Sequence, residues 1–229
     1  MKDYSSSENK IDINNIFSNN RLGFNDTLES GRSLTIGLDY EKEKEKDLTN
    51  INNYFAFKLA TVLRDEEENF VPKKTTINRK SSNIFGSANS IINDNLNFNY
   101  NFAIDNDFKT FEYNEFNATL NINNLITKFN FIEENGEMGD SNIIENSFEY
   151  SVDKNNSLSF KTRRNRKLNL TEYYDLVYEY KNDCLTAGIK YKKSYYEDRD
   201  LKPTENLLFT ITLFPLTTYE YDAKGLINN

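Results

Sequence analysis

The sequence predicts an all-β protein whose strands follow one another up and down in antiparallel order. The first observation is a series of runs in which apolar and polar residues alternate, as in strands with one apolar face. The second is that the runs are separated by turns rich in Asn, Asp and Lys. The third is the aromatic content of 14%, since aromatic residues favour strands and are scarce in disordered chains.

The alternation is clearest in residues 171–214, where three runs are joined by a tight turn and then by a longer charged loop. Residues at every second position of a strand share one face of a sheet. The apolar faces of these three runs contain Tyr174, Leu176, Tyr178 and Tyr180, then Leu185, Ala187, Ile189 and Tyr191, then Leu207, Phe209, Ile211 and Leu213. The rest of the chain repeats this pattern.

Reading the chain in order gives about 11 strands. They cover residues 32–41, 54–64, 81–92, 96–105, 115–122, 125–133, 142–152, 157–164, 171–180, 184–196 and 206–214. Residues 1–31 are expected to form an incoming loop, and residues 42–53 a charge-rich, solvated connection. Residues 217–229 are expected to form a C-terminal tail.

The connections between these strands alternate in length. Short turns are expected at residues 93–95, 123–124, 153–156 and 181–183, and longer loops at 65–80, 106–114, 134–141, 165–170 and 197–205. Residues 42–53 are the one exception, a long connection in a position where the alternation calls for a short turn. Outer-membrane barrels have this asymmetry, with short periplasmic turns and longer extracellular loops, and strands of roughly 8–11 residues match a tilted bilayer span.

The predicted fold is therefore an antiparallel up-and-down transmembrane β-barrel. Its apolar face would meet lipid and its polar face, with Lys, Asn and Arg, would line the lumen. An odd number of strands reached from an incoming loop indicates part of a larger barrel, which we do not expect to close or fold alone. In a soluble β-sandwich, the remaining alternative, the apolar face would pack on a second sheet.

Composition argues against several functions. A net charge of −8 without a basic stripe disfavours a nucleic-acid partner, and without any His the usual catalytic triads and most zinc sites are missing. We therefore do not expect the protein to be an enzyme or to bind a cofactor. The acidic clusters at residues 65–68 and 197–200 are interpreted as solvated loop charge, with binding of divalent cations as a lesser option. The N-terminus has no signal-peptide core, as expected of a fragment that lacks its signal peptide.

Four segments carry a family resemblance. Residues 14–40 contain an Asn-x-Phe step, an Asn-Arg pair and a Glu-x-Gly step before a strand, and residues 81–102 contain a Ser-x-Ile-x-Gly strand and a hairpin. Together with residues 54–64 and 174–216, they resemble the C-terminal half of the barrel in the LptD (organic solvent tolerance protein) family of outer-membrane LPS-assembly proteins. The match is most specific at 174–216. It covers roughly residues 11–218, the middle only as alternating strands, and Leu63 stands where the family has an aromatic residue.

The resemblance implies transport rather than catalysis. The chain would lie in the cell outer membrane, with residues 1–31 as an extracellular loop and residues 32–216 as the C-terminal half of the barrel. Lipopolysaccharide would pass into the outer leaflet through a lateral gate between the first and last strands. The implied partners are an LptE-like lipoprotein in the lumen and periplasmic LPS bridge proteins, which would act through an N-terminal domain outside this sequence. Another outer-membrane barrel, a porin or transporter, remains the main alternative, and a soluble β-sandwich binding module the lesser one.

Two site assignments follow from the resemblance. Cys184 lies at the periplasmic turn where many family members carry two adjacent cysteines, so it is a candidate for a disulfide to the N-terminal domain. The last strand would form one lip of the gate, and Pro215 would remove a hydrogen-bond donor at its end. The lip comprises Asn206, Leu207, Leu208, Phe209, Thr210, Ile211, Thr212, Leu213, Phe214 and Pro215.

Overall fold

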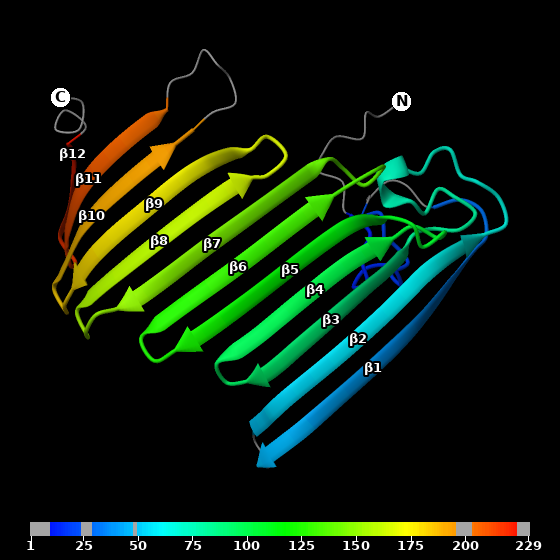
Figure 1. Ribbon diagram of the computed structural model, residues 1–229, viewed down its shortest axis with the longest axis horizontal. Helices are drawn as coiled ribbons and strands as arrows, with labels where there is room; N and C mark the ends of the chain where they lie inside the picture. Colours follow the sequence, from blue (N-terminus) through cyan, green and yellow to red (C-terminus); the bar gives the residue numbers. More distant parts are fainter. Residues whose placement is uncertain (1–9, 24–28, 48–49, 196–202, 224–229) are drawn as a thin grey trace. The chain divides into compact units, whose positions relative to one another are not determined.

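The computed structural model describes residues 10–23, 29–47, 50–195 and 203–223 (Figure 1). These residues form a single sheet of 12 strands, in which the hydrogen-bonded order of the strands follows the order of the chain. Neighbouring strands are antiparallel, and the one helical element is the 3-10 turn η1 (Lys73–Thr75). The predicted all-β class and the up-and-down order are confirmed.

The first two strands have 15 residues each and the last has six, and the others lie between these lengths. They are β1 (Ser33–Asp47), β2 (Asn50–Arg64), β3 (Ile84–Asn93), β4 (Leu96–Ile104), β5 (Phe111–Ile122), β6 (Leu125–Glu134), β7 (Ser141–Ser151), β8 (Asn156–Asn165), β9 (Leu170–Lys181), β10 (Leu185–Ser194), β11 (Thr204–Leu213) and β12 (Thr217–Asp222).

By its contacts the chain divides into two compact units. Unit 1 comprises Met1–Asn117 and Ile132–Ser141, and unit 2 comprises Ala118–Phe131 and Asn142–Asn229. Each unit is described by itself below. In both, we call the face that carries the predicted apolar alternation the outer face, and the opposite one the inner face.

The connection predicted at residues 42–53 is wrong, because most of it is strand. β1 and β2 each extend for 15 residues, and residues 48–49, which join them, lie outside the described part of the chain. The pairing continues from Tyr40↔Phe57 through Lys42↔Phe55 to Asp47↔Asn50. The Glu-Lys alternation, interpreted as solvated linker, is therefore compatible with a long hairpin that continues past the apolar residues.

The predicted strand count is one too low, because residues 217–222 form β12 within the segment assigned to a tail. β12 pairs with β11 from Leu213↔Thr217 to Leu208↔Asp222. The connection Phe214–Leu216 is short, and Leu216 N donates to the Leu213 carbonyl at 2.7 Å. Residues 224–229 and residue 196, the expected end of another strand, lie outside the described residues.

The structure retains the alternation of short and long connections over most of the sheet, but the connections 152–155 and 166–169, on either side of β8, are equally long. Short turns at residues 94–95, 123–124 and 182–184 contrast with connections at 65–83 and 195–203. Asn residues shape several turns: the Asn93 Oδ1 accepts from Leu96 N at 2.9 Å, and the Asn182 Oδ1 from Leu185 N at 2.8 Å. Asn123 adopts a positive φ of 51°, which Asn tolerates better than most residues.

The hydrophobic core lies in unit 1, on the inner face of the sheet. Residues 10–23, part of the segment expected to be an incoming loop, cover this face with buried Ile and Leu side chains. The core cluster comprises Ile11, Ile13, Ile16, Leu22, Ala60, Val62, Val71, Ile77, Phe85, Ala103 and Met138, with Tyr113 packed against it. The inner face is therefore apolar at this end, where the alternation alone predicts a polar surface.

Candidate functional site

The outer face of unit 2 presents aligned rows of apolar side chains. One row crosses six strands, and the pairing of the strands places its members directly opposite one another. It consists of Tyr150, Leu158, Tyr178, Ile189, Phe209 and Tyr221. With a strand spacing of about 4.8 Å, such a row extends for about 24 Å across the sheet.

Four of these six side chains are exposed, and Leu158 and Phe209 are partly buried. Tyr178 is 41% exposed, Ile189 42% and Tyr221 54%. With the neighbouring rows along each strand, the patch approaches the few hundred Å² at which the largest apolar patches of soluble monomers are found. No second sheet covers it among the residues that the structure describes, so the packing that a β-sandwich would use is not formed.

Unit 1 has an exposed apolar outer face of its own. In β1 the predicted alternating residues Leu34, Ile36, Leu38 and Tyr40 are each at least half exposed. β2 adds Phe55 and Leu63 to the same surface. Burying a side chain of this size is worth about 1.5–3 kcal/mol, and the described part of the chain does not make this gain on the outer face.

A diagonal row of aromatic rings crosses the outer face of unit 2, from Phe148 in β7 to Tyr195 just after β10. The Phe148 and Phe160 rings are stacked with centroids 5.5 Å apart, and Phe160 and Tyr174 follow at 6.2 Å. Tyr195 meets Tyr174 edge to face at 6.2 Å. Belts of amphipathic aromatic rings are typical of the boundary between lipid and water.

The inner face of unit 2 is charged. One row across it contains Ser147, Lys161, Asp175, Lys192 and Asn206. The Asp175 carboxylate lies 3.3 Å from the Lys190 Nζ, and Arg163 contacts Glu172 at 2.7 Å and Glu145 at 3.4 Å. The two faces of the same strands thus differ sharply in polarity.

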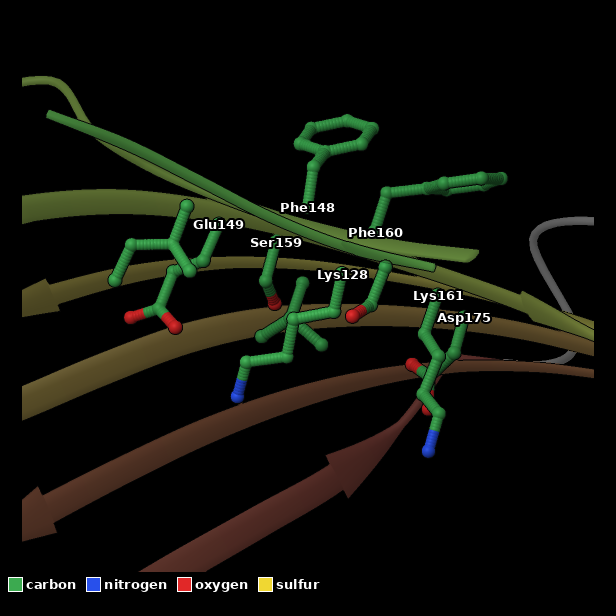
Figure 2. Close-up of a pocket in the computed structure, with 10 residues that line it drawn as sticks. Lys128, Phe148, Glu149, Ser159, Phe160, Lys161 and Asp175 are labelled. Carbon is green, nitrogen blue, oxygen red and sulfur yellow. The ribbon is translucent and has the colours of Figure 1, made fainter. Parts of the chain in front are cut away.

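A shallow pocket of about 220 Å³ lies on this inner face. Figure 2 shows Lys128, Lys161 and Asp175 on one side of the strands, whereas the rings of Phe148 and Phe160 point to the other side. The pocket brings lysine and carboxylate groups together with the hydroxyl of Ser159. Ile126 and Val177 also line it, so the pocket combines charged and apolar side chains.

The inner face of unit 1 is built from amides and carboxylates beyond its apolar end. Lys58 contacts Asp39 at 3.0 Å and Glu41 at 3.6 Å. Asn101 donates to Glu115 at 3.0 Å, and Asn117 donates to the same carboxylate at 3.2 Å.

Two buried arginines and one partly buried glutamate fix the N-terminal segment to the sheet. Arg21 Nε donates to the Glu29 Oε2 at 2.7 Å, and Arg21 Nη2 and Arg64 Nη2 both donate to the Glu29 Oε1. Arg64 Nε also donates to the Ile77 carbonyl at 2.6 Å. Arg21 is 6% exposed and Arg64 8%, and burial lowers the pKa of Arg21 from its ordinary value.

These three residues were not singled out from the sequence. The Asn-Arg pair and the Glu-x-Gly step in residues 14–40 contain Arg21 and Glu29, and residue Arg64 ends the alternating run 54–64. The signal in the sequence that could have identified Arg64 is its position as a charged residue at the end of an apolar run. The contact between them depends on the fold of residues 10–23, which periodicity does not predict.

The structure places Cys184 at the short turn between β9 and β10, where it is exposed and unoxidised. Its backbone N–H donates to the Asn182 Oδ1 at 3.0 Å. A disulfide to another domain stays a prediction, since only this chain is present.

The expected gate strand corresponds to β11, with one difference in position. Residues 206–213 lie in β11, which pairs with β10 on one side and with β12 on the other. β11 is therefore not the last strand, and β12 takes that place. Phe214 and Pro215 lie in the following turn, joined by a cis peptide bond.

Catalytic and metal-binding groups were not expected. Among the described residues, no group of three or more His, Cys, Asp or Glu side chains is placed to hold a metal ion. The acidic residues 65–68 lie in the connection before β3, where the Glu68 side chain accepts from Ser30 and from Phe70 N. Residues 197–200 lie outside the described residues.

No helix in the described part of the chain has the length and apolar character needed to cross a membrane. No protein-family model matches the chain, and no curated protein matches it.

Proposed function

We propose that this chain is the C-terminal part of an LptD-like outer-membrane β-barrel, which inserts lipopolysaccharide into the outer leaflet through a lateral gate. The observation that carries the membrane assignment is the exposed outer face, with Leu38 at 59% and Ile189 at 42%, on a single up-and-down sheet. The transport assignment rests on the resemblance of residues 14–40 and 174–216 to that family.

The contrast between the two faces supports this placement. In a transmembrane barrel, lipid replaces the second sheet that the outer face lacks, and the charged inner face lines a water-filled or protein-filled lumen. In each strand that has a neighbour on both sides, the backbone N–H and C=O groups form hydrogen bonds with the two neighbours. A hydrocarbon environment requires such pairing. The short turns would face the periplasm and the long connections the exterior.

Closure of the barrel is part of the proposal. Within the described residues β1 pairs with β2 alone and β12 with β11 alone. Open edges are not tolerated in hydrocarbon, so additional strands must complete the ring. The resemblance assigns these strands to an N-terminal portion of the same barrel.

The lateral gate would then involve the end of the sheet formed by β11 and β12. β12 has six residues against ten in β11, so fewer ladder hydrogen bonds hold it. A short terminal strand can part from its neighbour at lower cost than a long one. In this proposal β12 is the lip of the gate, and residues 206–215 form the strand and turn behind it.

The test is expression of the chain with a signal sequence, alone and together with the N-terminal portion that the resemblance implies, in the presence of an LptE-like lipoprotein. We expect the pair to enter the outer membrane, to shift on gels when unheated, and to retain the lipoprotein. Lipopolysaccharide should cross-link to a photoreactive residue placed in β12. A chain that is monomeric and soluble without detergent would overturn the membrane assignment and the transport function with it.

A porin or another barrel transporter is the second candidate, because it would share the outer face and the connection lengths. It differs in a measurable way. A porin conducts ions in planar bilayers without any lipoprotein, whereas a plugged LPS-assembly barrel retains the lipoprotein and conducts poorly.

A further inference from the structure

One short segment of this acidic chain is strongly basic. Five of the seven residues in 161–167, read as KTRRNRK, are Lys or Arg, whereas the whole chain carries a net charge of −8. The segment covers the end of β8 and the start of the connection to β9. Such a local excess of positive charge in an acidic protein calls for a physical explanation.

The alternation in β8 divides these charges between the two faces. Lys161 and Arg163 lie on the inner face, where Arg163 is paired with Glu172 and Glu145. Arg164 lies on the outer face, opposite Ile144 and on the same side as Phe160. Arg163 on the inner face has two carboxylate partners, whereas Arg164 is at the end of an apolar surface.

Arg166 follows in the turn, and with Arg164 it forms what we call the basic corner. Arg164 Nη2 donates to the Asn169 Oδ1 at 2.5 Å. Neither Arg164 nor Arg166 forms an ion pair with a carboxylate among the described residues, and both side chains are exposed. The basic corner therefore carries positive charge that the protein itself does not neutralise.

The turn that carries the basic corner is well defined by hydrogen bonds. Arg166 N donates to the Asn142 carbonyl at 2.8 Å, and Leu168 N donates to the Asn165 Oδ1 at 3.1 Å. Asn169 N donates to the Arg166 carbonyl at 3.2 Å and closes the turn with a positive φ of 51°. These hydrogen bonds hold in place the backbone to which the arginine side chains are attached.

The basic corner lies just beyond the row of aromatic rings on the outer face of unit 2. Arg164 is four residues after Phe160, which corresponds to about 13 Å along a strand. Lys193 contributes a further cation in this region, 5.5 Å from the ring centroid of Tyr195, and is paired with Glu205. Along the outer face of β8 the order is Leu158, Phe160 and then Arg164. Apolar, aromatic and basic groups follow one another in this order from hydrocarbon to headgroups.

We propose that the basic corner binds the phosphate groups of membrane lipids at the edge of the bilayer reached by this end of β8. Guanidinium groups match phosphate with two parallel hydrogen bonds, and basic residues at a membrane surface are attracted to anionic lipids. The proposal rests on the membrane placement of the outer face and goes beyond it, because transport through a gate does not require a lipid site on the outer surface of unit 2.

The test compares binding of the chain, refolded in detergent together with the N-terminal portion that the resemblance implies, to vesicles of phosphatidylcholine and to vesicles of phosphatidylcholine and phosphatidylglycerol in a four-to-one mixture, measured by flotation. We expect tighter binding to the anionic vesicles in spite of the acidic chain. A basic residue near such a surface contributes roughly fivefold in partitioning, so the Arg164→Gln/Arg166→Gln variant should lose roughly 20-fold of this gain.

Two matched variants complete the test. Arg164→Lys/Arg166→Lys keeps the charge and should keep most of the gain. Lys154→Gln/Lys181→Gln removes the same charge at the short-turn end of β8 and β9, where Asp153 and Asp183 already balance it, and should keep the full gain. Higher salt should reduce the gain of the unaltered chain.

The outcomes separate this inference from the proposed function. Binding to both vesicle types without any gain from phosphatidylglycerol, or an equal loss in both Gln variants, would overturn the lipid site and leave the membrane assignment intact. Failure to bind phosphatidylcholine vesicles would overturn the membrane assignment, and the lipid site with it.

Discussion

Arg21 binds Glu29 through two parallel hydrogen bonds, and Glu29 accepts a third from Arg64. The three residues belong to the N-terminal segment, to the connection before β1 and to the end of β2. Their contact unites segments that are up to 43 positions apart in the chain, from Arg21 to Arg64. The carboxylate compensates two buried cations, so each partner depends on it.

Replacing Glu29 with Gln should therefore destabilise unit 1. Gln offers one oxygen in place of two and no negative charge, and it leaves two buried guanidinium groups without their counter-ion. We expect a loss of about 3 kcal/mol, the scale on which removing one member of a buried ion pair destabilises a protein. Thermal unfolding and limited proteolysis of residues 10–23 in the detergent-solubilised protein would measure it.

Glu66→Gln is the matched control, because Glu66 is exposed in the connection before β3 and should be replaced at little cost. If the two variants unfolded at the same temperature, the interpretation of Glu29 as the counter-ion that holds the N-terminal segment would be wrong.

Two neighbouring residues of β11 test the assignment of the faces. Phe209 lies on the outer face opposite Ile189, whereas Thr210 lies on the inner face opposite Gly188 and Glu220. Phe209→Arg would place a cation in lipid, which costs about 2–4 kcal/mol near the middle of a bilayer, and should reduce membrane insertion strongly. Thr210→Arg should insert nearly as well as the unaltered chain, since its charge faces the lumen near Glu220.

Insertion is read from the heat-modifiable fraction in refolding experiments with lipid vesicles. The expected order is Thr210→Arg close to the unaltered chain and Phe209→Arg well below it. Equal insertion of the two variants would contradict the outward orientation of Phe209, and the reverse order would show that the faces are interchanged.

Most strands could be predicted because their signal is local. In residues 54–64, 96–105 and 206–214 the apolar alternation spans nearly the whole element, and the structure ends these strands within a few residues of the prediction. Residues 42–53 were missed because Glu and Lys at every second position resemble a solvated linker. Only the pairing with β2, which depends on residues elsewhere in the chain, shows that β1 continues to Asp47.

The inner-face core could not be predicted for a related reason. Ile11, Ile13 and Ile16 do not follow the period of a strand or of a long helix, and they are buried because they cover Ala60 and Val62 from a separate segment. Alternation reports which residues share a face of one strand. It does not report which loop folds onto that face, so the Arg21 and Glu29 pair was also missed.

The turn between β7 and β8 should respond to acid through Asp153. Hydrogen bonds from Asn155 N, then from the Asn156 side chain and Asn156 N, hold the pKa of Asp153 below its ordinary value of 3.8. Because the pKa is lowered in the folded turn, the contribution of Asp153 to stability is present above the ordinary pKa. It is lost as the pH falls through the lowered folded value.

Carboxyl NMR of the detergent-solubilised protein would locate this titration, which we expect below the ordinary value for Asp. The amide signals of Asn155 and Asn156 should shift over the same pH interval as their acceptor is protonated. Asp153→Asn should abolish the pH response of both amides. A titration of Asp153 at or above its ordinary value would show that the turn is not closed by these hydrogen bonds.

Cys184 and Leu168 lie at opposite ends of β9, which spans Leu170–Lys181, and they provide a test of how the strand crosses the membrane. Leu168 is exposed in the turn after β8, and Cys184 is exposed in the turn after β9. A strand of this length extends for about 40 Å, enough to place the two residues on different sides of a bilayer.

We expect a membrane-impermeant maleimide to label the Leu168→Cys/Cys184→Ser variant in intact cells, because the turn after β8 lies at the same end of the strands as the long connection between β10 and β11, which would face outward. The native Cys184 should be labelled only after the outer membrane is disrupted, and after reduction if it has formed a disulfide. Labelling of Cys184 alone in intact cells would mean that the chain is inserted in the opposite direction. Equal labelling of both positions in intact cells would show that β9 does not cross the membrane, because the two ends would then share one compartment.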